Sequence, residues 1–360
     1  MELELRHSGF SAPGGIGEHF FSVCGAAGKD FGEEAAAVLD AYDRALAEHG
    51  CSPATEQLLR LHLSDAANQE PRLRRMLAGR PGFLSVVGQA PLRGRIALEA
   101  WHWDREPARF AAHWFQCGRL RASGSQAQTE EEFAALKEFL ADRDGRVAEH
   151  TVRTWLYCRD VDNNYAGLVA GRNRFFSANG LTPDTHFIAS TGIGGETAEP
   201  SRLVKMDSLN LFGLHPGQTE YLSAPAMLSP TTLYGVSFER GTRVRFGDRS
   251  WYFISGTASI DRDGQVVHPG DVAAQTGRML DNVAALLDSG GATPSDIRWA
   301  TLYLRDLADA EIAGEIVRTE LGGELPLVIL RAPVCRPAWL VEMECMAISA
   351  SGDRRFAPFC

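Results

Sequence analysis

The stretch Leu340-Val-Glu-Met-Glu-Cys-Met-Ala-Ile348 has a counterpart earlier in the chain, Leu203-Val-Lys-Met-Asp-Ser-Leu-Asn-Leu211. Three positions match at a constant offset of 137 residues: Val204 with Val341, Met206 with Met343 and Asp207 with Glu344. Charged and apolar residues alternate in both stretches, which predicts a β-strand with two unlike faces. The pair indicates an internal duplication that ends each copy on such a strand.

The segments that precede the two strands also match. Gln128-Thr129 and Gln275-Thr276, offset by 147, each open a segment with apolar residues at helical spacing: Phe133, Leu136, Phe139 and Leu140 in the first, Leu280, Val283, Leu286 and Leu287 in the second. A strand-like run follows each helix and ends at Asp160 or Asp306. Each repeat therefore predicts an opening hairpin, a helix, a strand, a second helix and two closing strands.

This element order predicts an α+β fold with two repeats, each a mixed sheet carrying two helices on one face. Packing one repeat on the other buries the uncovered sheet faces. Turn composition at residues 215–218 places the boundary between residues 1–215 and residues 216–360. Residues 1–80 show helical spacing and are interpreted as a helical extension outside the repeat.

The composition excludes several classes of protein. The 360 residues are 44% hydrophobic with a formal net charge of −10, which argues against nucleic acid as a partner. No apolar run approaches the roughly 18 residues of a membrane helix, and the first residues do not resemble a signal peptide. The seven scattered cysteines fit reduced thiols in a cytoplasmic protein. No local spacing predicts a metal site.

Two carboxylates two residues apart mark the second closing strand. Glu342 and Glu344 point to the same face, where burial is costly unless the groups are paired or protonated. The first repeat has Lys205 where the second has Glu342. The difference favours one active and one inactive site, the alternative being two solvated positions that have drifted apart.

Other candidates lie nearby. Cys335 stands in a loop between two arginines and two prolines, and the simple alternative is a small buried apolar residue. Arg153, Trp155, Tyr157 and Arg159 share one face of the first-repeat strand, which could receive an aromatic-sized anion or could equally pack in an interface. Arg172 lies near a helix C-terminus, where a cation is favourable for dipole reasons alone.

Several motifs together resemble a known family. Residues 224–235, residues 251–259, the Gln-Thr helix and the closing strand are similar to the reactive-intermediate deaminase (RidA/YjgF) superfamily, over about Ala224–Ala350. Those deaminases carry an arginine before the penultimate strand that holds the substrate carboxylate. Here the stretch reads Glu324-Leu-Pro-Leu327, without an arginine.

The chain length, the degenerate first copy and the stretch VCRPAWLVE resemble the chorismatases, enlarged relatives that act on chorismate. The resemblance implies a catalytic acid at Glu342, and a pocket that includes Cys335 and Tyr234. It also places the turn residues Gly256, Thr257 and Ala258 at that pocket. No metal, flavin or nicotinamide is implied. The deaminases form trimers with sites between subunits, whereas here an internal interface can serve, in a monomer or a homo-oligomer.

The implied reaction cleaves the enolpyruvyl ether of chorismate to pyruvate and a cyclic acid, after a glutamic acid protonates the enol methylene. Tyr157, Arg159 and Arg172 are the residues of the first repeat expected to bind the dianion, although Arg159 could instead pair with Asp160. Cys335 favours 3-hydroxybenzoate as the product, whereas Ala258 could indicate the hydrolytic product, a dihydroxycyclohexadienoate. An imine deaminase and a ligand-binding module remain alternatives.

Overall fold

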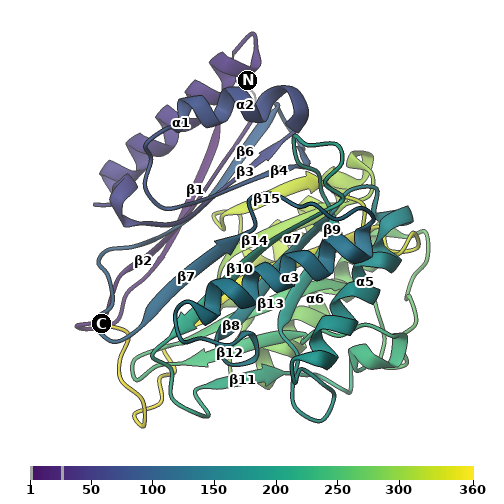
Figure 1. Cartoon of the computed structure of the whole chain (residues 1–360). Helices are drawn as coiled ribbons and strands as arrows, with labels where there is room; N and C mark the ends of the chain where they lie inside the picture. The colour runs from purple at the N-terminus through teal and green to yellow at the C-terminus, as the bar shows by residue number, and fades with distance from the viewer. Residues whose placement is uncertain (1–2, 26–27) are drawn as a thin grey trace.

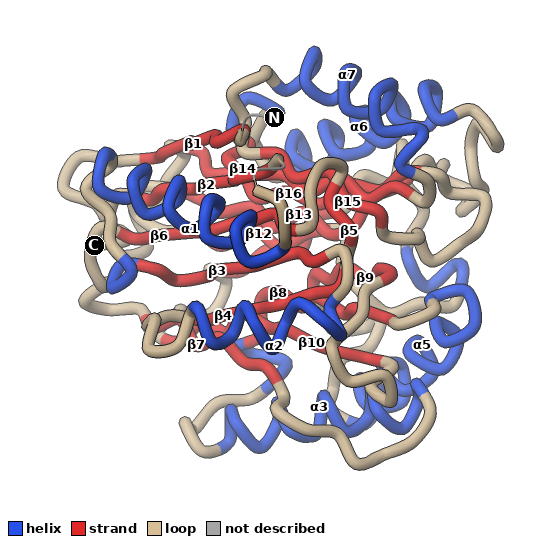
Figure 2. Tube along the Cα trace, turned by 90° about the horizontal axis from the view of Figure 1, so that it is seen from above, coloured by secondary structure: helices blue, strands red, loops and turns tan. Residues whose placement is uncertain are grey.

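The computed structural model describes residues 3–25 and 28–360. Its strands form sheets of five, four and seven strands. Figures 1 and 2 show the strands gathered in the interior, with the helices around the outside. The α+β class predicted from the sequence is confirmed.

The chain contains three units of the same topology. Unit 1 (residues 4–103) comprises β1 (Glu4–Phe10), β2 (Glu18–Cys24), α1 (Phe31–Glu48), β3 (Glu56–Leu63), α2 (Ala66–Met76), β4 (Phe83–Gly88) and β6 (Ile96–Trp103). Its sheet order is β1-β2-β6-β3-β4. The closing strand β6 therefore lies at the centre of the sheet, although it comes last in the unit.

Unit 2 (residues 111–212) lacks the first strand of the hairpin. It comprises β7 (Ala111–Gln116), α3 (Ser125–Ala141), the short α4 (Val147–His150), β8 (Thr151–Cys158), α5 (Val161–Ala178), β9 (Ala189–Gly194) and β10 (Val204–Phe212). The sheet order β7-β10-β8-β9 matches that of unit 1 without its edge strand.

Unit 3 (residues 219–349) is the most complete. It comprises β11 (Thr219–Leu222), β12 (Gly241–Arg245), β13 (Ser250–Ala258), α6 (Val272–Ser289), β14 (Ile297–Leu304), α7 (Ala310–Leu321), β15 (Leu327–Arg331) and β16 (Val341–Ser349). The core order β12-β13-β16-β14-β15 repeats that of unit 1, with β11 at one edge and the unit 1 strand β5 (Ala90–Pro91) at the other. Strand β5 thus ties unit 1 to unit 3.

The predicted architecture is confirmed for the second repeat, and for the first repeat except that one strand of its opening hairpin is missing; the number of repeats is three. Residues 1–80 are not a helical extension, because β1, β2 and β3 form a sheet with β4 and β6 there. The predicted domain of residues 1–215 therefore contains two units.

The Gln-Thr pair has a structural role that explains why it recurs. The Gln128 side chain accepts hydrogen bonds from the backbone N–H groups of Leu203 and Val204, at the start of β10. Gln275 accepts from the N–H of Leu340 at the start of β16. Each glutamine thus fixes its helix to the strand that closes its unit.

Unit 1 makes the same connection with a different residue. Glu34 on α1 accepts a hydrogen bond from the backbone N–H of Arg95, just before β6, and pairs with the Arg95 guanidinium at 2.7 Å. Glu34-Ala35 stands where the other units have Gln-Thr, so the motif is absent from the sequence although the contact is present.

The three sheets turn their uncovered faces toward one another. The helices of units 1 and 2 each cover a separate apolar cluster on the outer side of their own sheet. A larger cluster joins inward-facing residues of all three units, including Trp101, Trp155 and Trp251. The predicted packing of repeat on repeat therefore holds for three units.

The interior also contains charged residues, which are paired. Each closing strand supplies one carboxylate: Glu99, Asp207 or Glu344. Glu99 lies 3.5 Å from Arg60, Asp207 lies 2.8 Å from Lys205, and Glu344 lies 2.7 Å from Arg153. Buried carboxylates are costly unless a cation compensates them. The pair of Glu344 with Arg153 joins units 2 and 3, whereas the other two pairs each lie within one unit.

Candidate active site

A cavity lies between units 2 and 3, within a single chain. Unit 2 contributes α5 and β9, through Tyr165, Arg172, Ser190 and Gly192. Unit 3 contributes the β11–β12 connection, β13, β16 and the loop before β16, through Tyr234, Phe238, Arg240, Gly256, Ala258, Ile260, Cys335, Trp339 and Glu342. The predicted internal interface therefore exists between these two units.

Among the described residues that line this cavity, Glu342 alone provides a carboxyl group. It lies opposite Ala258 on β13 and opposite Tyr303 on β14, and its side chain is 5% exposed. A Cβ at position 256 would collide with Glu342 Oε1, so Gly256 allows the carboxyl group to lie against the β13 backbone. Burial and, to a lesser extent, the negative charge of Glu344 raise the pKa of Glu342 to about 8, against the opposing charges of Arg153 and Arg240. The group is therefore protonated at neutral pH.

Glu344 has the same orientation but a different environment. Its carboxylate accepts hydrogen bonds from Arg153 at 2.7 Å and from the Trp155 indole at 2.8 Å, and Arg60 lies 3.5 Å away. These partners come from units 1 and 2 and occupy both carboxylate oxygens. Of the two carboxyl groups on β16, Glu344 is therefore engaged in contacts between units, and Glu342 is the group that faces the cavity and is able to give up a proton.

Two buried arginines face the cavity without an anionic partner. Arg172 is 1% exposed and Arg240 is 6% exposed, and neither forms an ion pair with any residue in the described ranges. Nε and Nη2 of Arg172 and Nε of Arg240 have no hydrogen-bond partner there either. Uncompensated buried cations are costly, so this cavity is suited to an anionic ligand.

Aromatic rings and a thiol complete the walls. The Arg336 guanidinium lies 4.6 Å from the Tyr234 ring centre and 4.9 Å from that of Trp339. Burial raises the pKa of Cys335 to about 12, and the nearby Glu342 contributes. The thiol is therefore protonated at neutral pH, which argues against a thiolate nucleophile.

The structure brings together six of the nine residues predicted for the site: Glu342, Cys335, Tyr234, Gly256, Ala258 and Arg172. Thr257 lies between two lining residues but points to the other face of β13, because it pairs with Met343. Its hydroxyl donates to the Ser255 carbonyl oxygen. Thr257 therefore shapes the turn rather than the cavity wall.

The structure places Tyr157 and Arg159 outside this cavity, contrary to expectation. Tyr157 pairs with Lys205 on β10, and its ring centre lies 4.8 Å from Lys205 Nζ in the paired interior. Arg159 follows the end of β8, where it forms a 2.9 Å ion pair with Glu196 and donates to the Thr197 carbonyl oxygen. Unit 2 reaches the cavity through α5 and β9, not through β8.

Seven lining residues are not among those predicted from the sequence, and Tyr165 and Arg240 are the two with ionisable side chains. Tyr165 on α5 contacts Cys335, and Gly192 on β9 leaves room for its ring, since a Cβ there would lie 3.1 Å from it. Arg240 lies in an irregular connection before β12. No periodic spacing in the sequence indicates either residue, because both reach the cavity through tertiary packing of distant segments.

The equivalent positions in the other units have lost this arrangement. Lys205 in unit 2 corresponds to Glu342, and its ammonium group binds Asp207 and Ser85. Unit 1 has Ala97 at the same position of β6. The predicted contrast between Lys205 and Glu342 thus corresponds to a buried ion pair in one unit and an unpaired carboxyl group in the other.

Comparisons with known proteins place this arrangement in a family. The family model Endoribonuclease L-PSP matches residues 244–349. A RutC family protein of Pyrococcus abyssi is 30% identical over 99 residues, which cover 27% of this chain and 78% of the relative. The chain belongs to the RutC family. The 3-aminoacrylate deaminase RutC of Acinetobacter baylyi is 28% identical over 96 residues, which cover 26% of this chain and 76% of that protein.

A solved structure extends the likeness to most of the chain. A crystal structure of a chorismatase matches with a TM-score of 0.63 at 21% sequence identity, covering 81% of this chain and 93% of that one. At this identity the match shows a shared fold. This member of the RutC family therefore has the enlarged fold of a chorismatase, as the sequence resemblance predicts.

None of the helices in the described part of the chain is long and apolar enough to cross a membrane.

The raised pKa of Glu342 predicts how stability depends on pH. Between the ordinary carboxyl pKa of about 4.5 and the folded value of about 8, the folded state binds more protons than the unfolded state. Stability therefore falls as pH rises through this window. Glu342→Gln removes the ionisation and should be the more stable protein at about pH 9, on the order of a few kcal/mol, with a smaller difference at about pH 5.

Thermal unfolding of both proteins at the two pH values measures this difference. The other titrating groups are common to both proteins and cancel in the comparison. An equal difference between the two proteins at both pH values would show that Glu342 ionises normally in the folded state.

Proposed function

We propose that the protein cleaves the enolpyruvyl ether of chorismate, releasing pyruvate and a cyclic acid, with Glu342 as the proton donor. The observation that carries this proposal is the pair of buried arginines, Arg172 and Arg240, which have no anionic partner among the described residues and share a cavity with a protonated carboxyl group. The fold shared with a solved chorismatase supports the same substrate.

The charges of the cavity suit a dicarboxylate. Chorismate carries one carboxylate on its ring and one on its enolpyruvyl arm, so the bound dianion balances Arg172 and Arg240. Glu342 adds no negative charge while it is protonated. Phe238 and Trp339 provide apolar surface for the cyclohexadiene ring. A monoanionic imine would leave one of the arginines uncompensated.

The reaction then needs one proton and one nucleophile. The Glu342 carboxyl group transfers its proton to the enol methylene, which becomes a methyl group, and the adjacent carbon acquires oxocarbenium character. If a water molecule attacks that carbon, the bond between it and the original ether oxygen breaks, and pyruvate and the dihydroxy diene are released. If the ring hydroxyl attacks, the same bond breaks and leaves the original ether oxygen on the ring as a hydroxyl. The bond between the ring and the attacking oxygen then breaks as the ring loses a proton, which releases pyruvate and the aromatic acid and returns a proton to Glu342. A carboxyl group with a pKa of about 8 is suited to this step, because it is protonated at neutral pH and still a competent acid.

We propose 3-hydroxybenzoate as the cyclic product. Cys335 and Ala258 both line the cavity that contains Glu342. Ile260 and Trp339 add apolar wall, and Glu342 is 5% exposed, so access of water to the oxocarbenium carbon is restricted. Attack by the ring hydroxyl consumes no water overall, whereas attack by water gives the dihydroxycyclohexadienoate.

Glu342→Gln should lower chorismate turnover by about 10² or more, because the amide keeps the shape and lacks the transferable proton. Pyruvate release is measured with lactate dehydrogenase, and chromatography of the same reaction identifies the cyclic acid. In the wild type we expect turnover to fall as pH rises through about 8, where Glu342 loses its proton. Glu344→Gln is the matched comparison, with a smaller effect on turnover and a larger effect on stability.

The outcomes separate the alternatives. A dominant dihydroxycyclohexadienoate peak would show that this compound is the product in place of 3-hydroxybenzoate, and the assignment of Glu342 as the acid would stand. Hydrolysis of 2-aminoacrylate without chorismate turnover would indicate an imine deaminase, and tight chorismate binding without turnover a ligand-binding module. A larger loss of turnover in Glu344→Gln than in Glu342→Gln would assign the acid to Glu344.

Arginine variants test the proposed binding of the dianion. Arg172→Gln and Arg240→Gln should each raise KM for chorismate by about 10- to 100-fold, since each removes a charge-assisted hydrogen bond worth about 1.5–3 kcal/mol. Arg159→Gln is the matched control, because Arg159 pairs with Glu196 outside the cavity, and its KM should not change. Steady-state kinetics of the three variants make the comparison. An unchanged KM in both cavity variants would contradict the assignment.

A further inference from the structure

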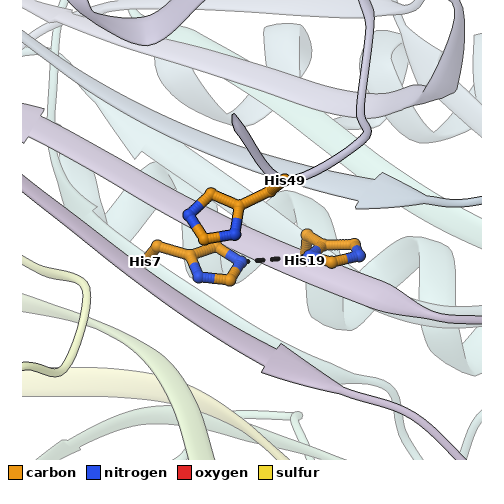
Figure 3. A group of neighbouring side chains, drawn as sticks. All are labelled: His7, His19 and His49. Atoms are coloured by element: carbon orange, nitrogen blue, oxygen red, sulfur yellow. Dashed lines mark hydrogen bonds between the residues drawn. The ribbon is translucent and has the colours of Figure 1, made fainter. Parts of the chain in front are cut away.

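Three histidines that are distant in the sequence lie together on unit 1. His7 belongs to β1, His19 to β2, and His49 is the residue that caps the C-terminus of α1. Their ligand nitrogens all lie within 4.8 Å of one another. Figure 3 shows the His49 ring stacked on that of His7, with His19 beside them. No two of the three have the short spacing of a metal motif, so the sequence does not reveal the group.

The strand register explains how the group forms. In the β1–β2 hairpin, His7 lies opposite Phe21 and Gly9 lies opposite His19, so both histidines point to the face that carries α1. Phe21 packs edge-on against Tyr42 of α1 on that face. His49 reaches the same place because the α1 backbone ends there, where its N–H donates to the Ala45 carbonyl oxygen.

We propose that His7, His19 and His49 bind a divalent transition-metal ion, with zinc as the probe ion. Imidazole is a preferred ligand for zinc, copper and nickel, and three histidines with one open position form a common zinc site. The site uses residues of unit 1 alone. It is therefore independent of the cavity between units 2 and 3 and of the function proposed for that cavity.

The distance between His7 and His19 is close to that of such a site. His7 Nε2 lies 3.0 Å from His19 Nδ1. Two nitrogens bound to one tetrahedral zinc at about 2.0–2.1 Å are roughly 3.3 Å apart. The His49 ring is stacked on that of His7 with the ring centres 3.6 Å apart, so it must rotate to direct a nitrogen at the ion, and His49 is exposed. The hydrogens then reside on His7 Nδ1 and His19 Nε2, and the ion replaces the single N–H···N contact.

Burial is also consistent with a surface metal site. His7 and His19 are half-buried and His49 is exposed, so the fourth position of a tetrahedral ion faces water. The ion connects the edge strand β1 to the end of α1, and so links the helix to the edge of the sheet that it covers. Cys51 is close in sequence, but its thiol donates to the carbonyl oxygen of His49, and we do not include it among the ligands.

The test uses the full-length chain after chelator treatment and dialysis. Calorimetric titration with zinc should show one equivalent bound, and zinc should raise the melting temperature. Cobalt(II) should give visible d–d bands of a four-coordinate site without a sulfur-to-cobalt charge-transfer band. His49→Ala and His19→Asn should each weaken zinc binding by at least about 10²-fold, since the loss of a ligand should cost no less than the loss of a residue that supports one.

His215→Ala is the matched control, because His215 is exposed in the linker between units 2 and 3 and should leave binding unchanged. His49 is exposed, so its replacement should not disturb folding, which circular dichroism checks. Zinc binding that persists in His49→Ala would overturn the proposal. So would binding that disappears after thiol alkylation of the wild type, or no binding at all.

Discussion

The ion pair between Glu344 and Arg153 is the interaction on which the candidate site depends. It joins the closing strand of unit 3 to the sheet of unit 2, and Arg60 of unit 1 approaches the same carboxylate. Removal of one partner from such a buried pair strongly destabilises a protein, because the remaining charge is left uncompensated. The pair therefore fixes the interface that forms the cavity. It also keeps a negative charge beside Glu342, which helps to hold that second carboxyl group in its protonated form.

The three units show how one fold can keep a single site. The same position of the closing strand holds Ala97 in unit 1, Lys205 in unit 2 and Glu342 in unit 3. Only in unit 3, within the described ranges, does this position carry an unpaired carboxyl group facing unpaired arginines. Because the three units lie in one chain, each interface between units is free to differ from the others.

The sequence predicts the repeat through residues that contact the backbone. Gln128 and Gln275 each bond to the start of a closing strand, and such a contact constrains the residue type strongly. The sequence does not reveal unit 1 in this way, because Glu34 makes the equivalent contact there in place of a glutamine. Leu39, Tyr42 and Leu46 on α1 nevertheless follow the same apolar spacing. Arg240 and Tyr165 could not be predicted, since irregular segments and helix packing bring them to the cavity. The alternation of side chains along a β-strand correctly places Glu342 and Glu344 on one face of β16. It could not show which residues of other segments each carboxyl group contacts.

The protonation state of Glu342 tests the account most directly. Infrared difference spectroscopy of the wild type against Glu342→Gln isolates this carboxyl group, because the other buried carboxyl groups, including Glu18 and Glu132, are present in both proteins and cancel. We predict a protonated carboxyl band in the wild type at neutral pH that disappears as pH rises through about 8. A carboxylate band for Glu342 at neutral pH, with no protonated band, would contradict its role as the proton donor.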